Sequence, residues 1–164
     1  MDARGAGRRV LVAEDEFVIA LEVGDVLRGA GYEVVGPAAT AGEAGRLARE
    51  GPPEAAVLDI ALRDGTAFAA ADALAARGVP FVFLSGYPAE VLPDRFRGRP
   101  VLDKPFAAER LPAALEAASR EQRVRLRAHA IREREGRPEG EDARHWAEAE
   151  AGLRAEEGRG RAAG

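Results

Sequence analysis

Short apolar runs alternate with longer amphipathic stretches over about the first 118 residues of the chain. Each run has the length of a β-strand, and several are rich in valine. The predicted strands are residues 8–13, 32–38, 55–60, 79–85 and 99–104. Because these runs are apolar on both faces, they are typical of a parallel sheet that is covered by helices.

The stretches between the runs predict helices, and glycine or a Gly-Pro pair follows each of the first three. They cover residues 16–30, with Phe17, Ala20, Leu21, Val23 and Leu27 as the apolar positions, then 41–50, 67–77 and 86–97, and a fifth helix begins between Ala107 and Pro112. Two prolines make the fourth helix poor or irregular. Alternating strands and helices indicate an α/β fold: a flavodoxin-like, doubly wound, five-stranded parallel sheet of order 2-1-3-4-5.

Polar residues stand where the predicted strands end, which is where such sheets bind ligands. The first strand is followed by Glu14 and Asp15, and the third by Asp59. Since these two strands are neighbours in the predicted order, the three carboxylates should converge and repel one another unless a cation neutralises them. A hard divalent ion with oxygen ligands fits best, so the sequence predicts a Mg²⁺ site.

Two further residues complete the rim of this site: Ser85 ends the fourth strand and Lys104 follows the fifth. Lys104 is the single lysine among 24 basic residues, and a compact ammonium suits a site built around a point charge. Plainer readings exist, since Ser85 can cap a helix and Lys104 can survive by chance in a turn. The clustering at four strand ends favours a functional site, in which a carboxylate beside Mg²⁺ attacks a phosphoryl group.

The motifs "VLVAEDE", "AVLDI", "FLSGY" and "VLDKPF" resemble, in order and spacing, the receiver domain of two-component response regulators. The likeness is greatest to stand-alone receivers with a Phe-Ala-Thr-Gly-Tyr-like motif. The resemblance implies that Asp59 accepts the phosphoryl group. It also implies that Asp15 binds Mg²⁺ directly, Glu14 binds it through water, and the backbone carbonyl of Ala61 is a further ligand. Ser85 and Lys104 would bind phosphoryl oxygens, and the Lys104–Pro105 bond would be cis.

Several positions depart from the receiver pattern. Val101 replaces the usual switch aromatic, with Tyr87 as the nearest substitute, and the loop after Asp59 is short. A phosphohydrolase of the haloacid-dehalogenase type would need a second Asp two residues after Asp59, where Ala61 stands, so a turnover enzyme is not expected. Two alternatives stay open: a constitutive receiver-like binding module and a small Mg²⁺-dependent phosphohydrolase.

Residues 119–157 are charged, rich in alanine and without strand signals, and they predict a helical extension that folds back as a hairpin. Val124, Ala128 and Ile131 form one stripe, and Trp146, Ala149 and Leu153 another. The segment "AIREREGRPEGEDARHWAEAE" resembles a small bacterial domain of unknown function. Trp146 is assigned to the core of the hairpin, and a metal site at His145 is not expected, because His129 is the one other histidine and cysteine is absent.

Composition sets the remaining expectations. A net charge of −4 gives no electrostatic reason to expect a nucleic-acid partner, and no apolar run approaches the roughly 20 residues of a membrane span. We therefore expect a cytoplasmic protein with a receiver domain at residues 8–118 and disordered ends at 1–7 and 158–164. Its expected partners are a sensor histidine kinase or histidine phosphotransfer protein. Output would pass by protein contact through the face of the fourth helix, fifth strand and fifth helix or through the hairpin, or by phosphorelay, and a homodimer is compatible with the sequence.

Overall fold

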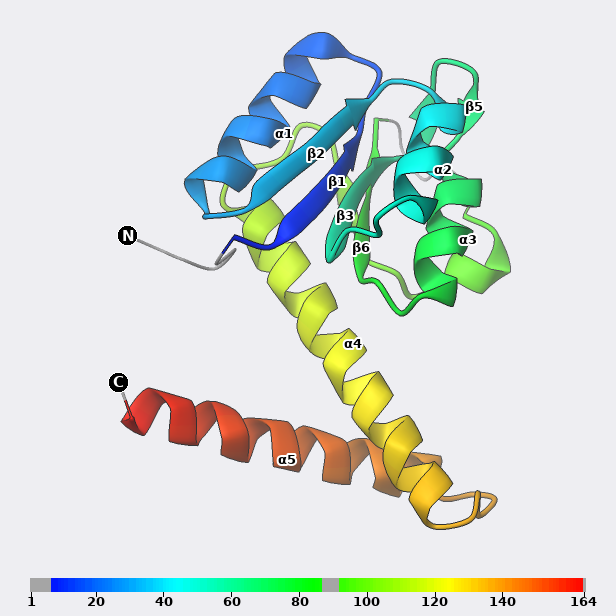
Figure 1. Cartoon of the computed structure of the whole chain (residues 1–164), viewed down its shortest axis with the longest axis vertical. Helices are drawn as coiled ribbons and strands as arrows, with labels where there is room; N and C mark the ends of the chain where they lie inside the picture. Colours follow the sequence, from blue (N-terminus) through cyan, green and yellow to red (C-terminus); the bar gives the residue numbers. More distant parts are fainter. Residues whose placement is uncertain (1–6, 87–91, 164) are drawn as a thin grey trace. The chain divides into compact units, whose positions relative to one another are not determined.

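The computed structural model describes residues 7–86 and 92–163, and its centre is a five-stranded parallel sheet (Figure 1). The strand order is β2-β1-β3-β6-β7, which confirms the predicted doubly wound topology. The strands are β1 (Arg9–Ala13), β2 (Glu33–Ala38), β3 (Ala55–Asp59), β6 (Phe81–Ser85) and β7 (Val101–Asp103). In β3 and β6 every residue is buried, as strands covered on both faces must be.

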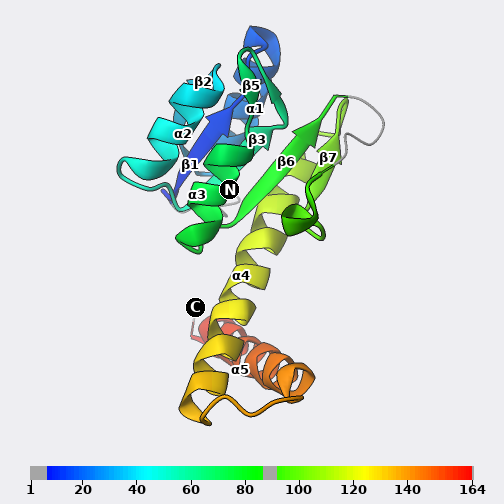
Figure 2. The same cartoon turned by 90° about the vertical axis from the view of Figure 1, so that its right-hand side faces the viewer.

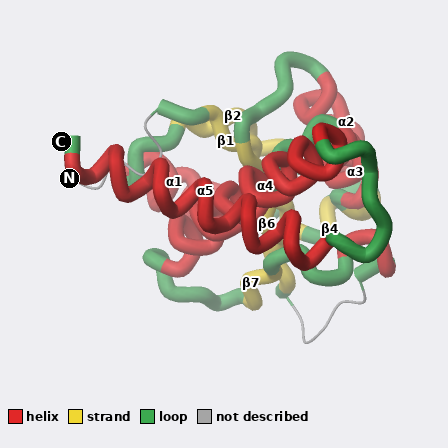
Figure 3. The backbone as a smooth tube through the Cα atoms, turned by 90° about the horizontal axis from the view of Figure 1, so that it is seen from below, coloured by secondary structure: helices red, strands yellow, loops and turns green. Residues whose placement is uncertain are grey.

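Helices cover the sheet on both faces and create two apolar cores (Figures 2 and 3). On one face, α2 (Ala41–Arg49) and α3 (Phe68–Ala76) pack on Leu11, Leu58 and Phe83. On the other face, α1 (Phe17–Gly29) and the first turns of α4 (Arg110–Arg134) pack on Val12 and Val82. This arrangement leaves the carboxyl ends of the strands uncovered, so polar residues there can reach one another.

The expected apolar face of α1 is partly wrong. Ala20, Val23 and Leu27 are buried as predicted, but Phe17 and Leu21 are exposed, and Val18 between them is exposed as well. The three buried residues are spaced three and four apart and form one stripe. Leu21 is four residues after Phe17 and lies on a different flank of the helix, so it does not reach the sheet.

The predicted fourth helix is also different in the structure. Within its described part, only Asp94–Phe96 is helical, and this is a single 3-10 turn, η1. Phe96 is buried among the rings of Phe68, Phe81 and Phe83 at centroid distances of 5.4–6.1 Å. Arg95 adds two hydrogen bonds to Asp72 of α3, 2.7 and 3.0 Å long. Aromatic packing therefore holds this segment where a helix was expected.

A small two-stranded hairpin follows β3 and was not predicted. It consists of β4 (Ala61–Leu62) and β5 (Gly65–Thr66), which pair antiparallel. The turn between them contains only Arg63 and Asp64, and Gly65 has a φ of 154° that favours glycine. The short loop that the sequence shows after Asp59 is thus an ordered hairpin.

The chain divides into two compact units at Ser119–Arg120, and the second unit is a helical hairpin. It joins the last turns of α4 to α5 (Asp142–Ala162) around Val124, Ile131, Ala149 and Leu153, with Trp146 packed against this core. Ion pairs show that the helices run antiparallel, because positions moving back along α4 meet positions moving forward along α5. These pairs are Arg134–Glu148, Arg127–Glu156 and Arg120–Glu157.

Two predictions about the chain ends meet different outcomes. Disorder at residues 158–164 is wrong for the described part, since α5 continues through Gly158 and Gly160 to Ala162 (Figure 3). Each exposed glycine costs a helix only about 1 kcal/mol, and the arginines and alanines around them favour helix. The prediction for residues 1–7 falls outside the described residues except for Gly7, whose N–H donates to the carbonyl of Gly31 at 2.9 Å. No helix in the described ranges is both long enough and apolar enough to span a membrane.

Candidate functional site

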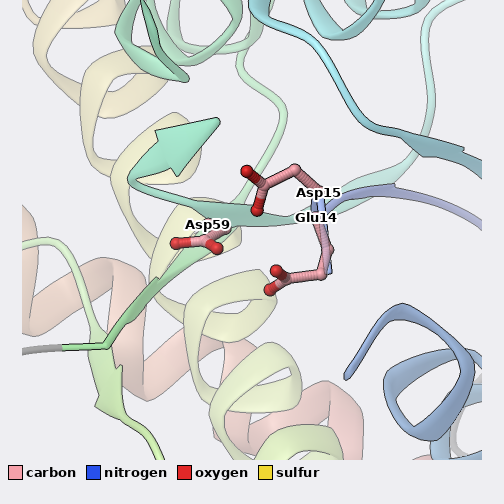
Figure 4. Close-up of side chains that lie close together, drawn as sticks. All are labelled: Glu14, Asp15 and Asp59. Atoms are coloured by element: carbon pink, nitrogen blue, oxygen red, sulfur yellow. The ribbon is translucent and has the colours of Figure 1, made fainter. Parts of the chain in front are cut away.

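Three carboxylates meet at the carboxyl ends of β1 and β3. Ala13 pairs with Leu58 in the parallel register, so Glu14 and Asp59 follow at the same level of neighbouring strands. One oxygen each of Glu14, Asp15 and Asp59 lies within 4.8 Å of the others (Figure 4). Glu14 is 2% exposed and Asp59 5%, whereas Asp15 is half-buried. Within residues 7–86 and 92–163, this is the group of acidic side chains with the spacing that a metal ion requires.

Lys104 lies between two of these carboxylates. Its Nζ donates to Glu14 Oε2 at 2.7 Å and to Asp59 Oδ2 at 2.9 Å. The backbone of Lys104, which directly follows β7, is held beside the end of β6, because the Lys104 N–H donates to the carbonyl of Ser85 at 2.8 Å. The Lys104–Pro105 bond is cis, as the resemblance implied. The chain's single lysine is therefore the counter-ion of the acidic cluster. Its compact ammonium contacts two carboxylates at once.

Burial sets the charge state of this cluster. Removal from water raises the pKa of Glu14 to about 7, even though the hydrogen bond from Lys104 favours the ionised form. For Lys104, burial lowers the pKa, but the hydrogen bonds to Glu14 and Asp59 outweigh it, and the net shift is upward. Lys104 therefore stays protonated, whereas the charge of Glu14 responds to pH and to any added cation.

The remaining predicted residues lie at the same place. Ser85 is buried at the end of β6, on the strand beside β3. Ala61 is exposed in β4 and lines a cavity of about 790 Å³ together with Asp15, Asp59 and Lys104. The structure thus brings all six predicted residues together, while their individual roles stay predictions. Val101 is exposed on the edge strand β7, and Tyr87, its suggested substitute, lies outside the described residues.

An apolar wall beside the acids was not predicted as part of the site. The cavity continues along α1 and the segment after Lys104, where it is lined by Ile19, Val26, Pro105 and Phe106. Three acidic residues also line it: Glu16, which precedes α1, and Glu22 and Asp25 of α1. The spacing of Ile19, Glu22 and Val26 along one side of the helix could have shown this, had the position of α1 been known.

The second unit holds a separate polar network that joins its two helices. His145 is 1% exposed, and its Nε2 lies 2.7 Å from Glu135 Oε2. Hydrogen bonds from Arg144 and His145 lower the pKa of Glu135 to about 2. Glu135 follows the last turn of α4 and both partners belong to α5, so this network ties the turn of the hairpin together. The described contact of His145 is therefore a structural one, with Glu135 of the same hairpin.

Known proteins match both units. Residues 119–155 match the family described as "Protein of unknown function (DUF2934)". The "Transcriptional regulatory protein PdtaR" of Mycobacterium tuberculosis is 37% identical over 116 residues, which cover 68% of this chain and 56% of that protein. The solution structure of SdrG from Sphingomonas melonis is 38% identical with a TM-score of 0.60 and covers 70% of this chain and 97% of that one.

A third similar structure is described as a receiver domain protein. The response regulator receiver domain protein (CheY-like) from Methanospirillum hungatei is 26% identical, with a TM-score of 0.63 over 71% of this chain and 96% of that one. The fold and the acidic strand ends define a receiver-type α/β protein. The chain belongs to the response regulator receiver family, with a C-terminal DUF2934 segment. It spans about half the length of the curated relative, at 56%.

Proposed function

We propose that this protein is a phospho-accepting switch of two-component signalling, with Asp59 as the acceptor. The observation that carries the proposal is the Lys104 ammonium held between Glu14 and Asp59, beside Asp15. A cluster with this composition concentrates negative charge and one positive group at an open cavity. Such a site is suited to an incoming phosphoryl group that arrives with a divalent cation.

The donor set fits Mg²⁺, because all its groups are hard oxygens. Asp15 and Asp59 would hold the ion directly, Glu14 would hold it through water, and the backbone carbonyl of Ala61 would complete the protein ligands. Mg²⁺ supplies charge neutralisation that lets a negative phosphoryl group approach a carboxylate.

The chemical step forms a bond between a carboxylate oxygen of Asp59 and phosphorus, while the bond from phosphorus to the donor breaks and its electron pair leaves with the donor. Lys104 would exchange its contact with Asp59 Oδ2 for a phosphoryl oxygen, which lies within reach of its flexible stem. Ser85 would donate its hydroxyl to another phosphoryl oxygen. The product is an acyl phosphate, and we propose that it is a signal and not an intermediate of turnover, because Ala61 stands where a second catalytic carboxylate would be needed.

Intact-mass spectrometry after incubation with acetyl phosphate tests this proposal. Wild type should gain one phosphoryl group with Mg²⁺ and none with excess chelator. Asp59→Asn should gain none, and Asp15→Asn should need a much higher Mg²⁺ concentration. An unmodified wild type under all conditions would contradict the proposal and favour a constitutive binding module.

The phosphodonor in a cell would be a sensor histidine kinase or a histidine phosphotransfer protein. Such a donor must bring its phosphohistidine to Asp59, and the cavity that reaches Asp59 continues along α1. Its apolar wall of Ile19, Val26 and Phe106 suits the apolar side of a partner helix. The acids on its rim favour a donor with basic residues beside that apolar side. Output would be a protein contact made by the described surface of η1, β7 and α4, or by the hairpin.

A substitution on α1 should separate protein donors from small ones. Ile19→Glu is expected to slow phosphoryl transfer from a protein donor about tenfold or more, because it places a charge in the apolar wall. Phosphorylation by acetyl phosphate should stay within about twofold of wild type. Leu21→Glu is the matched control, since Leu21 lies on the same helix but does not line the cavity. Equal losses with both variants, or a parallel loss with acetyl phosphate, would contradict docking at this wall.

A further inference from the structure

Asp64 lies in the turn between β4 and β5, and its side chain contacts the start of α2. It lies at the tip of the β4–β5 hairpin, and its Oδ1 accepts a hydrogen bond from the N–H of Ala41, the first residue of α2. Its other oxygen would lie 4.0 Å from a Cβ placed on Gly42 in the same helical turn. A carboxylate at this position is favoured by the exposed N–H groups and the dipole of the helix.

Other contacts join the same two segments. The Arg63 N–H donates to the carbonyl of Ala39 at 3.4 Å, and a Cβ on Gly65 would lie 3.8 Å from that of Ala41. Leu62 is buried in the core between the sheet and α2. The hairpin tip is thus attached by one hydrogen bond to the first residue of α2, by a second to Ala39 just before this helix, and by packing.

The base of the hairpin belongs to the functional site. Ala61 directly follows Ile60, the neighbour of Asp59, and it pairs with Thr66 across the hairpin. The carbonyl of Ile60 accepts from the Ala67 N–H at 3.0 Å. Ala61 has no buried side chain of its own to fix its backbone, because its side chain is a methyl group on an exposed residue. Its position therefore depends on the rest of the hairpin, which is held by the buried Ile60 and Leu62 at its base and by the attachment of its tip beside α2.

We infer that Asp64 is a positioning residue for the metal site, which fastens the β4–β5 hairpin to α2 and so holds the backbone of Ala61 where its carbonyl can bind Mg²⁺. This rests on the proposed function. A hairpin that is not attached to α2 would still form. The Ala61 carbonyl would then have to be ordered when the ion binds, and the free energy of this ordering would weaken Mg²⁺ binding.

The test compares three variants of the full chain by calorimetric Mg²⁺ titration. Asp64→Ala should bind Mg²⁺ about fivefold more weakly than wild type. Asp64→Asn should bind within about twofold, because an amide oxygen can still accept from the Ala41 N–H. Thr40→Ala is the matched control: Thr40 Oγ1 caps the same helix by accepting from the Glu43 N–H at 3.1 Å, a hydrogen bond that joins the helix to its own N-cap and not to the hairpin.

A second readout needs no metal. In metal-free protein, amide hydrogens of residues 61–66 should exchange faster in Asp64→Ala than in wild type, and their exchange in Thr40→Ala should be unchanged. Wild-type affinity in Asp64→Ala, or equal weakening by Thr40→Ala, would overturn the inference while leaving the proposed function intact. Absence of Mg²⁺ binding by wild type would overturn both.

Discussion

Replacing Lys104 with alanine is expected to lower the free energy of unfolding by about 3 kcal/mol at pH 8 in Mg²⁺-free buffer. The variant leaves two buried carboxylates, Glu14 and Asp59, without the ammonium that contacts both at 2.7 and 2.9 Å. Chemical denaturation followed by circular dichroism measures the effect. Mg²⁺ should restore part of the loss, because it neutralises the same oxygens.

The loss should shrink as the pH falls. Burial raises the pKa of Glu14 from its ordinary 4.5 to about 7, so the folded state binds this proton more tightly than the unfolded state. Ionised Glu14 therefore destabilises the fold increasingly as pH rises from about 4.5 to 7. Without the hydrogen bond from Lys104 the pKa of Glu14 rises further, so this dependence extends to higher pH, and at pH 6 protonation of Glu14 removes the charge of one of the two uncompensated carboxylates.

Arg97→Ala is the control for this experiment, because Arg97 pairs with Asp94 on the surface at 2.6 Å and is largely exposed. Such a pair contributes at most about 1 kcal/mol. A loss in Lys104→Ala that is no larger than in Arg97→Ala would contradict the view of Lys104 as the counter-ion of the site. So would a loss that is the same at pH 6 and pH 8.

Phe96→Ala is expected to cost about 3–5 kcal/mol of unfolding free energy. Phe96 is 1% exposed and its ring packs against three others, so truncation leaves a cavity in the core between the sheet and α3. The same residue fixes the segment that replaces the expected fourth helix, and its loss should release this segment. Urea unfolding gives the free energy, and limited proteolysis detects cleavage around residues 92–99.

Arg95→Ala separates the ring packing from the surface contact. It removes the two hydrogen bonds to Asp72 and the contact of the guanidinium with the Phe96 ring at 4.6 Å, but it leaves the packing of Phe96 against the three other rings, and we expect a loss of at most about 2 kcal/mol. If Phe96→Ala costs less than about 1 kcal/mol, aromatic packing is not what holds this segment.

The sheet and the site could be predicted because they depend on features that a sequence displays. Valine-rich runs covered on both faces identify β1, β3 and β6, and a parallel sheet brings all their carboxyl ends to one edge. Glu14, Asp59 and Ser85 therefore meet without any knowledge of loops. Lys104 could be singled out because arginine supplies every other basic side chain in the chain.

What could not be predicted depends on long-range packing. The two prolines indicate an irregular fourth helix, but the burial of Phe96 of η1 in an aromatic pocket is not revealed by local helix propensity. The anchoring of Asp64 to α2 joins residues 23 positions apart and depends on where α2 begins. The exposure of Phe17 and Leu21 shows that an apolar residue at helical spacing need not face the sheet.

The central claim is that Asp59 itself carries the phosphoryl group, and borohydride trapping tests it most directly. Borohydride reduces an acyl phosphate to an alcohol, so peptide mapping after treatment with acetyl phosphate and Mg²⁺ identifies the modified residue. We expect conversion of Asp59 to homoserine in wild type, with no conversion when Mg²⁺ is chelated. Trapping at Glu14 or Asp15, or phosphate carried on a residue outside this cluster, would contradict it.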